Sequence, residues 1–148
     1  MVGAFEWREA FIGSMRFIPM GRGLSPVEEM LRLRGTQPCD SSWEFGRLVL
    51  DPRYRAGHEL LQKCVFLGVS HLARNFACRT AYASCNQVLS RLYRRFGFSV
   101  VADDVRVPGE EKPYHLIRAT VQDVLMSSAT SAEDRALAQR LVAGAVAA

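Results

Sequence analysis

The chain has 148 residues, of which 49% are hydrophobic and 23% charged, and its net charge is +4. This composition fits one globular domain with a substantial core and argues against a disordered or coiled-coil chain. The longest mainly apolar runs, such as 64–69, are far below the ~20 residues of a membrane span. The N-terminus lacks the basic start and apolar run of a signal peptide, so we expect a cytoplasmic protein.

The four cysteines form no CxxC pair, and the three histidines show no metal-ligand spacing. We therefore expect reduced thiols and no metal. The positive charge is concentrated, with Arg91, Arg94 and Arg95 on one predicted helix and Arg53 and Arg55 in one turn. Such clusters favour a localised anionic partner over a wide nucleic-acid surface.

The first half of the chain predicts a strand, a short helix and a second strand. The strand covers residues 10–20, broken near its end by a proline. The helix has Ser25 as N-cap, a proline at its first position and Gly35 as its stop signal. The β-rich segment 43–50 then ends in the turn 51–57.

The second half alternates helices and strands. Apolar residues at helical spacing predict a core-facing helix over 58–75, and a strand follows at 77–84. Asn86 or Ser84 caps the next helix, which Gly97 ends. The remaining predicted elements are a hairpin-like pair of strands, at 98–107 and 114–125, and a C-terminal tail from Ser127 that is either a capped, Ala-rich helix or a frayed end.

This order of elements predicts an α/β (α+β) fold with helices packed on a mixed sheet. Residues 43–84 form one right-handed βαβ unit. We expect a single domain over 1–126 and a helical tail over 127–148. In such a sheet, ligands bind where neighbouring strands part and helix N-termini point at them.

Two motifs resemble those of the GNAT acyltransferase superfamily. They are "LVLDPRYR" at 48–55 and the run from Asn86 to Phe98, which fits the pattern N-x6-Y-x-x-x-G-F. Two more resemble acyl-homoserine-lactone (autoinducer) synthases and N-acyl amino acid synthases, both of GNAT fold. These are "GSMRFIPMGRGLSPVEEML" at 13–31 and "WEFGRL" at 43–48. Together the motifs span roughly residues 11–125.

The resemblance implies a mixed, mostly antiparallel sheet with a central βαβ unit and helices on both faces. The autoinducer synthases carry further strands and helices at the front, which wall the acceptor site. This chain begins almost directly at the third strand of that fold. We therefore expect these N-terminal elements to be missing, and the acceptor pocket to be incomplete or supplied by something else.

The resemblance also implies transfer of an acyl group from a thioester to an amine. Glu44 is the candidate base for the amine, directly or through water, and Tyr93 matches the GNAT tyrosine that protonates the leaving thiolate. Asn86 would orient the pantetheine arm or a bound water beside it. Three structural alternatives stay open: an arginine-paired Glu44 that supports the fold, a Tyr93 that only packs in the core, and an Asn86 that is only an N-cap.

The other candidate residues fall into three groups. Candidate cofactor contacts are Leu50, Arg53, Arg55, Ala56, Gly57, His58 and Asn86. Candidate substrate contacts are Trp43, Arg47, Ser84 and Cys85, although the strand period puts Arg47 on the opposite face from Glu44 unless a bulge intervenes. Candidate carrier-protein contacts are Arg91, Arg94 and Arg95, although these three could instead form only a solvated face with cations favourably placed near the helix C-terminus.

The turn after residue 50 contains only Gly57 where acetyl-CoA enzymes carry a Gly-rich pyrophosphate loop. A phosphopantetheine arm on an acyl carrier protein therefore fits better than CoA as donor, although acyl-CoA remains possible. The leading hypothesis is an N-acyltransferase acting on an amino-acid-like amine. The alternatives are a conventional acetyl-CoA-dependent N-acetyltransferase and a catalytically silent GNAT module that acts as an interaction partner.

Overall fold

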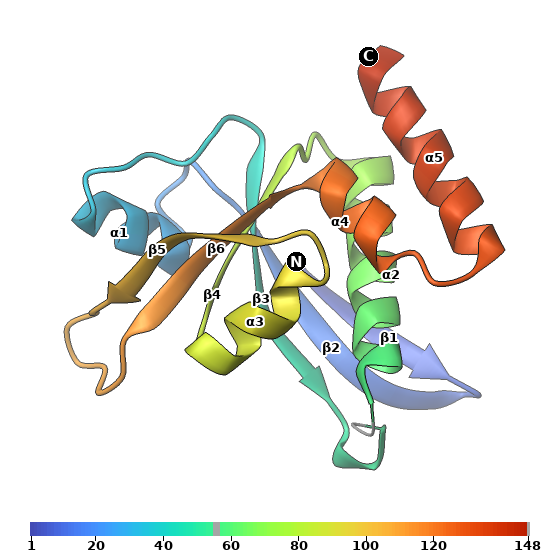
Figure 1. Ribbon diagram of the computed structural model, residues 1–148, viewed down its shortest axis with the longest axis horizontal. Coiled ribbons are helices and arrows are strands. Elements are labelled where there is room, and N and C mark those ends of the chain that lie inside the picture. Colours follow the sequence, from blue (N-terminus) through green and yellow to red (C-terminus); the bar gives the residue numbers. More distant parts are fainter. Residues whose placement is uncertain (55–56, 148) are drawn as a thin grey trace.

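The computed structural model describes residues 1–54 and 57–147 (Figure 1). Its strands are β1 (Val2–Trp7), β2 (Ala10–Pro19), β3 (Ser42–Leu50), β4 (Thr80–Cys85), β5 (Ser99–Val105) and β6 (Tyr114–Thr120). Its helices are α1 (Pro26–Leu33), α2 (His58–Asn75), α3 (Gln87–Arg94), α4 (Val121–Ser128) and α5 (Ala132–Ala147), with a short 3₁₀ turn at Pro52–Tyr54.

The strands form one six-stranded sheet in the order β1-β2-β3-β4-β6-β5. Every neighbouring pair is antiparallel except β3 and β4, which are parallel and joined through α2. This is the predicted mixed, mostly antiparallel sheet with a central βαβ unit. The expected fold class is therefore confirmed.

Helices cover both faces of the sheet. The larger core lies under α2, α3 and α4 and is centred on Phe66, Leu72 and Ile117, all fully buried. A smaller core lies under α1, where Val27 and Leu31 pack on Tyr82 of β4. Figure 1 shows α5 beside α2 and α4, and its Ala138 is fully buried against them.

Strand β1 is absent from the sequence-based prediction, which placed the first strand at residue 10. The β1–β2 hairpin turns at Arg8 and Glu9, which have φ angles of 49° and 64°. This left-handed conformation is the one that two-residue hairpin turns require, and Gly or Asn usually marks it in a sequence. Since neither stands here, the usual turn signal is missing.

The predicted strand 114–125 is wrong in its second half. Strand β6 ends at Thr120, whose hydroxyl accepts a hydrogen bond from the backbone N–H of Asp123 at 3.0 Å. This N-cap starts α4, which buries Val121, Val124 and Leu125 on one side. The valines favour a strand by propensity, but the capping residue and the helical spacing of the buried positions prevail.

The predicted N-caps at Ser25 and Asn86 are confirmed. The Ser25 hydroxyl accepts from the N–H of Glu28 at 3.2 Å, and the Asn86 side chain accepts from the N–H of Leu89 at 2.8 Å. The helical alternative for the C-terminal tail is confirmed as well, because α5 forms after Ser131, whose hydroxyl accepts from the Asp134 N–H.

Glycine at position 13 allows β2 to approach β3 closely. A Cβ there would overlap the carbonyl oxygen of Val49 and lie 2.7 Å from Cδ2 of Leu50. We expect Gly13→Ala to lower the free energy of unfolding by about 3 kcal/mol, the upper range for an overpacked core. Thermal unfolding checks this, with Gly144→Ala as matched control because a Cβ at 144 meets nothing within 4 Å. Equal melting temperatures for the two variants would contradict the expectation.

Candidate active site

Strands β3 and β4 pair only at their first three residues, from Ser42↔Thr80 to Glu44↔Tyr82. Beyond Glu44 the two strands part, and Figure 1 shows their C-terminal ends pointing in different directions. A bulge in β3 accompanies the separation. Two steps along β2, from Ser14 to Arg16, correspond to three along β3, and Arg47 in the bulge has a φ of 49°.

A cavity of about 170 Å³ lies where the strands separate. Its lining comes from β2, β3, α2, β4 and α3, with Phe98 just after α3. Four of the predicted site residues meet here: Arg47 from β3, Ser84 and Cys85 from β4, and Tyr93 from α3. The bulge that sequence analysis could not locate brings Arg47 to the cavity.

Tyr93 is a partly buried titratable residue of this cavity. Its ring makes edge contacts with Phe96 and Phe98, with centroids 6.0 and 5.6 Å apart. Burial, with a smaller contribution from Cys85, raises the pKa of the Tyr93 phenol to about 12. The hydroxyl is therefore protonated at neutral pH and can donate a proton.

Cys85 is buried, and its burial raises the pKa of the thiol to about 11. The thiolate, which is the nucleophilic form, is therefore disfavoured at neutral pH. This argues against covalent catalysis by Cys85 and leaves it as a wall residue of the cavity.

Glu44 is 3% exposed and does not line the cavity. Its Oε1 accepts from Nη2 of Arg16 at 3.1 Å, while its Oε2 accepts from the Ser25 hydroxyl at 2.5 Å and from the Val27 N–H at 3.2 Å. The carboxylate thus ties β3 to β2 and to the start of α1 at the last β3–β4 pair. Sequence reasoning gave no role to Arg16 or Ser25 in this network.

Gly46 makes room for this ion pair. A Cβ at position 46 would lie 3.2 Å from Oε1 of Glu44 and 3.7 Å from Nη2 of Arg16. The geometry favours the fold-supporting alternative for Glu44, because three donors already occupy its two oxygens.

Apart from Asn86, which caps α3, the predicted cofactor contacts that the structure describes lie in or beside the β3–α2 connection. Leu50 is buried at the end of β3, and Gly57 and His58 lie exposed at the start of α2. Gly57 has a φ of 95° and no side chain to accept from the first N–H groups of the helix, and no side chain among the described residues caps them. A helix N-terminus of this kind can bind an anion. Arg55 and Ala56 lie outside the described residues.

The Arg53 guanidinium pairs with the Asp51 carboxylate at 2.8 Å. The hydrogen bond with Asp51, followed by its charge, raises the pKa of Arg53. Since both side chains belong to the turn itself, this exposed pair shapes the loop, and a phosphate would have to compete with Asp51 for Arg53.

Two groups of predicted residues lie away from the cavity. Trp43 is at the opposite end of β3 and packs on Phe76, with ring centroids 5.1 Å apart. Arg91, Arg94 and Arg95 are exposed at the C-terminal end of α3 and, within residues 1–54 and 57–147, form no ion pair.

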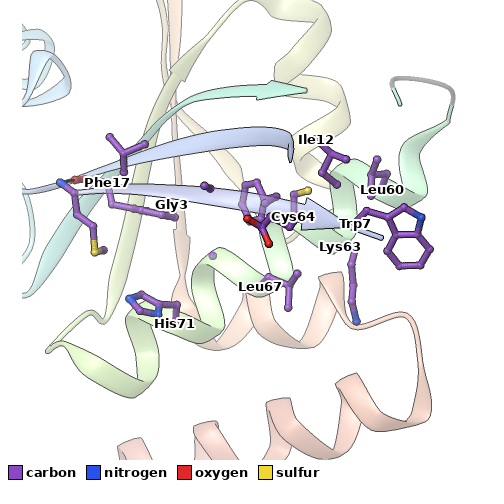
Figure 2. Close-up of a pocket in the computed structure, with 15 residues that line it drawn as sticks. Gly3, Trp7, Ile12, Phe17, Leu60, Lys63, Cys64, Leu67 and His71 are labelled. Atoms are coloured by element: carbon purple, nitrogen blue, oxygen red, sulfur yellow. Dashed lines mark hydrogen bonds between the residues drawn. The ribbon is translucent and has the colours of Figure 1, made fainter. Parts of the chain in front are cut away.

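A larger groove of about 610 Å³ separates β1 and β2 from α2. Figure 2 shows Trp7 and Lys63 at one end of it and His71 at the other. Trp7 and Leu67, exposed by 55% and 45%, make its rim apolar. Sequence reasoning missed this groove because β1, which forms one wall, was not predicted.

Within the described ranges, no helix combines the length and apolar character needed to cross a bilayer. The same residues include no cluster of three His, Cys, Asp or Glu side chains that could hold a metal ion.

No protein-family model matches the sequence, and no curated protein matches it. Solved structures do match in fold. One is TofI in a ternary complex with an inhibitor and MTA, with a TM-score of 0.61 at 16% identity, covering 89% of this chain and 68% of that one. Another is BjaI, a CoA-dependent acyl-homoserine lactone synthase with SAM and isopentyl-CoA, with a TM-score of 0.60 at 14% identity, covering 95% and 64%.

An aminoglycoside 6'-acetyltransferase type Ii matches with a TM-score of 0.57 at 17% identity, covering 81% of this chain and 68% of that one. The chain therefore has the GNAT fold, as the motifs predicted. It spans about two thirds of the length of each of these three structures.

Proposed function

We propose that the protein is an N-acyltransferase whose acyl thioester binds between the separated ends of β3 and β4. The observation that carries this proposal is the parting of the strands after Glu44, with Tyr93 enclosed at the resulting cavity. Unpaired backbone groups of parting strands can hydrogen-bond an extended amide chain such as pantetheine. The N-terminus of α2, which no described side chain caps, lies at the end of the same connection and suits a phosphate.

In this mechanism the deprotonated amine attacks the thioester carbonyl and forms the new C–N bond. Collapse of the tetrahedral intermediate then breaks the C–S bond, and the Tyr93 hydroxyl protonates the leaving thiolate. The nitrogen releases its proton to water, and the Tyr93 phenolate regains a proton from solvent. Asn86 uses its side-chain oxygen as the cap of α3, so its amide nitrogen is the group left to orient the pantetheine arm.

We assign Glu44 a supporting role in this reaction. Its hydrogen bonds to Arg16, Ser25 and Val27 fix the point where β3 leaves β4. Arg47, which the bulge brings to the cavity, is the candidate contact for the acceptor.

The donor is an acyl carrier protein or CoA thioester, and the acceptor an amino-acid-like amine. One neighbour in fold, a CoA-dependent acyl-homoserine lactone synthase, supports a CoA thioester as donor, and a second, an aminoglycoside 6'-acetyltransferase, supports acyl transfer to a small molecule. The second keeps open the rival proposal of a conventional acetyl-CoA-dependent N-acetyltransferase.

Thiol release from acyl carrier protein, long-chain acyl-CoA and acetyl-CoA, measured over a panel of amines and amino acids, tests the proposal. Amine-dependent release from a carrier protein or long-chain thioester supports the leading assignment, whereas release from acetyl-CoA alone supports the rival. No release from any donor would point to a catalytically silent module.

The arginines of α3 are our candidate docking surface for an acidic carrier protein. Replacing Arg91 and Arg95 by Glu should raise KM for an acyl carrier protein by about tenfold at low salt and less at high salt, since exposed charges act through a screened field. The KM for a short pantetheine thioester should not change. Steady-state kinetics on both donors measure this.

A double variant of two other exposed arginines, Arg8→Glu with Arg106→Glu, controls for the change in net charge. If it raised the carrier-protein KM equally, α3 would have no special part in docking.

A further inference from the structure

A groove of about 620 Å³ lies at the opposite end of β4 from the candidate active site. It is bounded by the end of α2, the segment leading into β4, the start of α4 and the last turns of α5. The active-site cavity, in contrast, is lined by the last residues of β4. The two cavities share no lining residue, so this groove requires an explanation of its own.

The groove is apolar at its base and along its sides. Val121 and Leu125 of α4 are 7% and 1% exposed. Leu141 and Val142 of α5 pack partly on the same core, while the Phe76 ring is 41% exposed. The volume lies within the ~300–1,000 Å³ of sites that bind drug-sized molecules. These surfaces suit a hydrocarbon chain.

Three arginines from separate segments line the same groove. Arg74 is in the last turn of α2, Arg79 directly precedes β4, and Arg140 is on α5. None of the described residues that line the groove is acidic. Among residues 1–54 and 57–147, none of the three guanidinium groups has a carboxylate partner within ion-pair distance or a side-chain hydrogen bond.

Elsewhere in the protein, arginines such as Arg16 and Arg53 pair with a carboxylate at 3.1 Å or closer, Arg16 with Glu44 and Arg53 with Asp51. Their charge is thus balanced locally. Three uncompensated cations around one groove instead create a positive potential beside an apolar surface. Guanidinium groups bind carboxylate and phosphate oxygens through paired N–H donors. The groove thus complements an apolar chain with an anionic head.

We propose that this groove is a second ligand site, which binds an amphipathic anion. The hydrocarbon chain lies against Phe76, Leu125 and Leu141, and a carboxylate or phosphate head is held by Arg74, Arg79 and Arg140. The site does not depend on the proposed acyl transfer, because it shares no lining residue with the active-site cavity.

Trp43 provides the readout, because its ring packs on Phe76 of the groove wall. The chain has two tryptophans, so Trp7→Phe leaves Trp43 as the only one. Dodecanoate, titrated below its micelle concentration, should change Trp43 fluorescence saturably. Dodecanol and dodecyltrimethylammonium should bind at least about tenfold more weakly, a difference of about 1.4 kcal/mol. Comparing dodecyl phosphate with dodecanoate shows which head group the site prefers. Inorganic phosphate shows whether the anion binds without its chain.

Two variants in the Trp7→Phe background locate the site, with isothermal calorimetry as second readout. Replacing Arg74, Arg79 and Arg140 by Gln should raise Kd for dodecanoate by at least about tenfold. Gly144→Leu should block the groove without unfolding the chain, because a Cβ at 144 meets nothing within 4 Å and leucine is the better helix former.

The matched control replaces Arg91, Arg94 and Arg95 by Gln, which removes the same charge from α3, and should leave Kd unchanged. Equal affinity for dodecanoate and dodecanol would overturn the proposal. So would an unchanged Kd in Gly144→Leu or in the groove triple variant, since binding would then lie elsewhere. An equal loss in the α3 variant would overturn it too, because net charge alone would explain the binding.

Discussion

Replacing Tyr93 by Phe should lower kcat about 10²-fold and leave KM nearly unchanged. The expected factor is that of a lost general acid, since the ring and its contacts with Phe96 and Phe98 stay in place. The pKa of about 12 keeps the hydroxyl protonated throughout the range in which amines lose their protons. The defect should therefore persist from neutral to moderately alkaline pH, as steady-state kinetics across pH can check.

Tyr114→Phe is the matched control for this variant. Tyr114 is on β6 and its hydroxyl donates to Glu110 at 3.3 Å, away from the cavity. Removal of the Tyr114 hydroxyl should not change kcat. Full turnover in Tyr93→Phe, with unchanged thermal stability, would return Tyr93 to a packing role.

Glu44→Gln should lower the free energy of unfolding by about 3 kcal/mol. The amide loses the charge that faces Arg16. In either orientation its N–H₂ group faces a donor, Arg16 on one side or Ser25 and the Val27 N–H on the other. Breaking a buried ion pair typically costs about 3–5 kcal/mol, and the 29% exposed Arg16 side chain puts the effect at the lower end. Urea unfolding gives the value directly.

The same variant should lose activity by the same factor at all pH values, as expected of a residue that positions β3. Recovery of turnover at high pH would identify Glu44 as the base instead. The matched control is Glu29→Gln, which removes an exposed carboxylate paired with Arg32 on α1. The hydrogen bond from Arg32 lowers the pKa of Glu29, but both side chains are in solvent, so the melting temperature should hardly change.

Helices α1 and α3 were predictable because their N-terminal ends carry specific capping residues. Ser25 and Asn86 accept hydrogen bonds at their N-caps, so local chemistry decides where those helices begin. The β1–β2 hairpin was missed because Arg8 and Glu9 have positive φ angles, and neither residue type usually indicates such a turn in a sequence. Helix α4 was missed because valine propensity was weighed above the cap at Thr120.

The candidate site was predictable in part. The Asn86–Phe98 motif located Tyr93, and strand position located Ser84 and Cys85. The Arg16–Glu44–Ser25 network could not be predicted from the sequence, because it joins three segments and the pairing of β2 with β3 depends on a bulge. Arg74 and Arg79 flank the connection from α2 to β4, and the packing of α5 brings Arg140 to them across a long stretch of sequence.

The central claim is that the thioester arm binds between β3 and β4 against Tyr93. Fluorine NMR of protein labelled with fluorotyrosine tests it without requiring turnover. The four tyrosines give four resonances, which Tyr→Phe variants assign. On titration with an unreactive thioether analogue of acyl-pantetheine, the Tyr93 resonance should shift most, while Tyr82 and Tyr114, in the core under α1, should not. Saturable binding with no shift at Tyr93 would contradict the account.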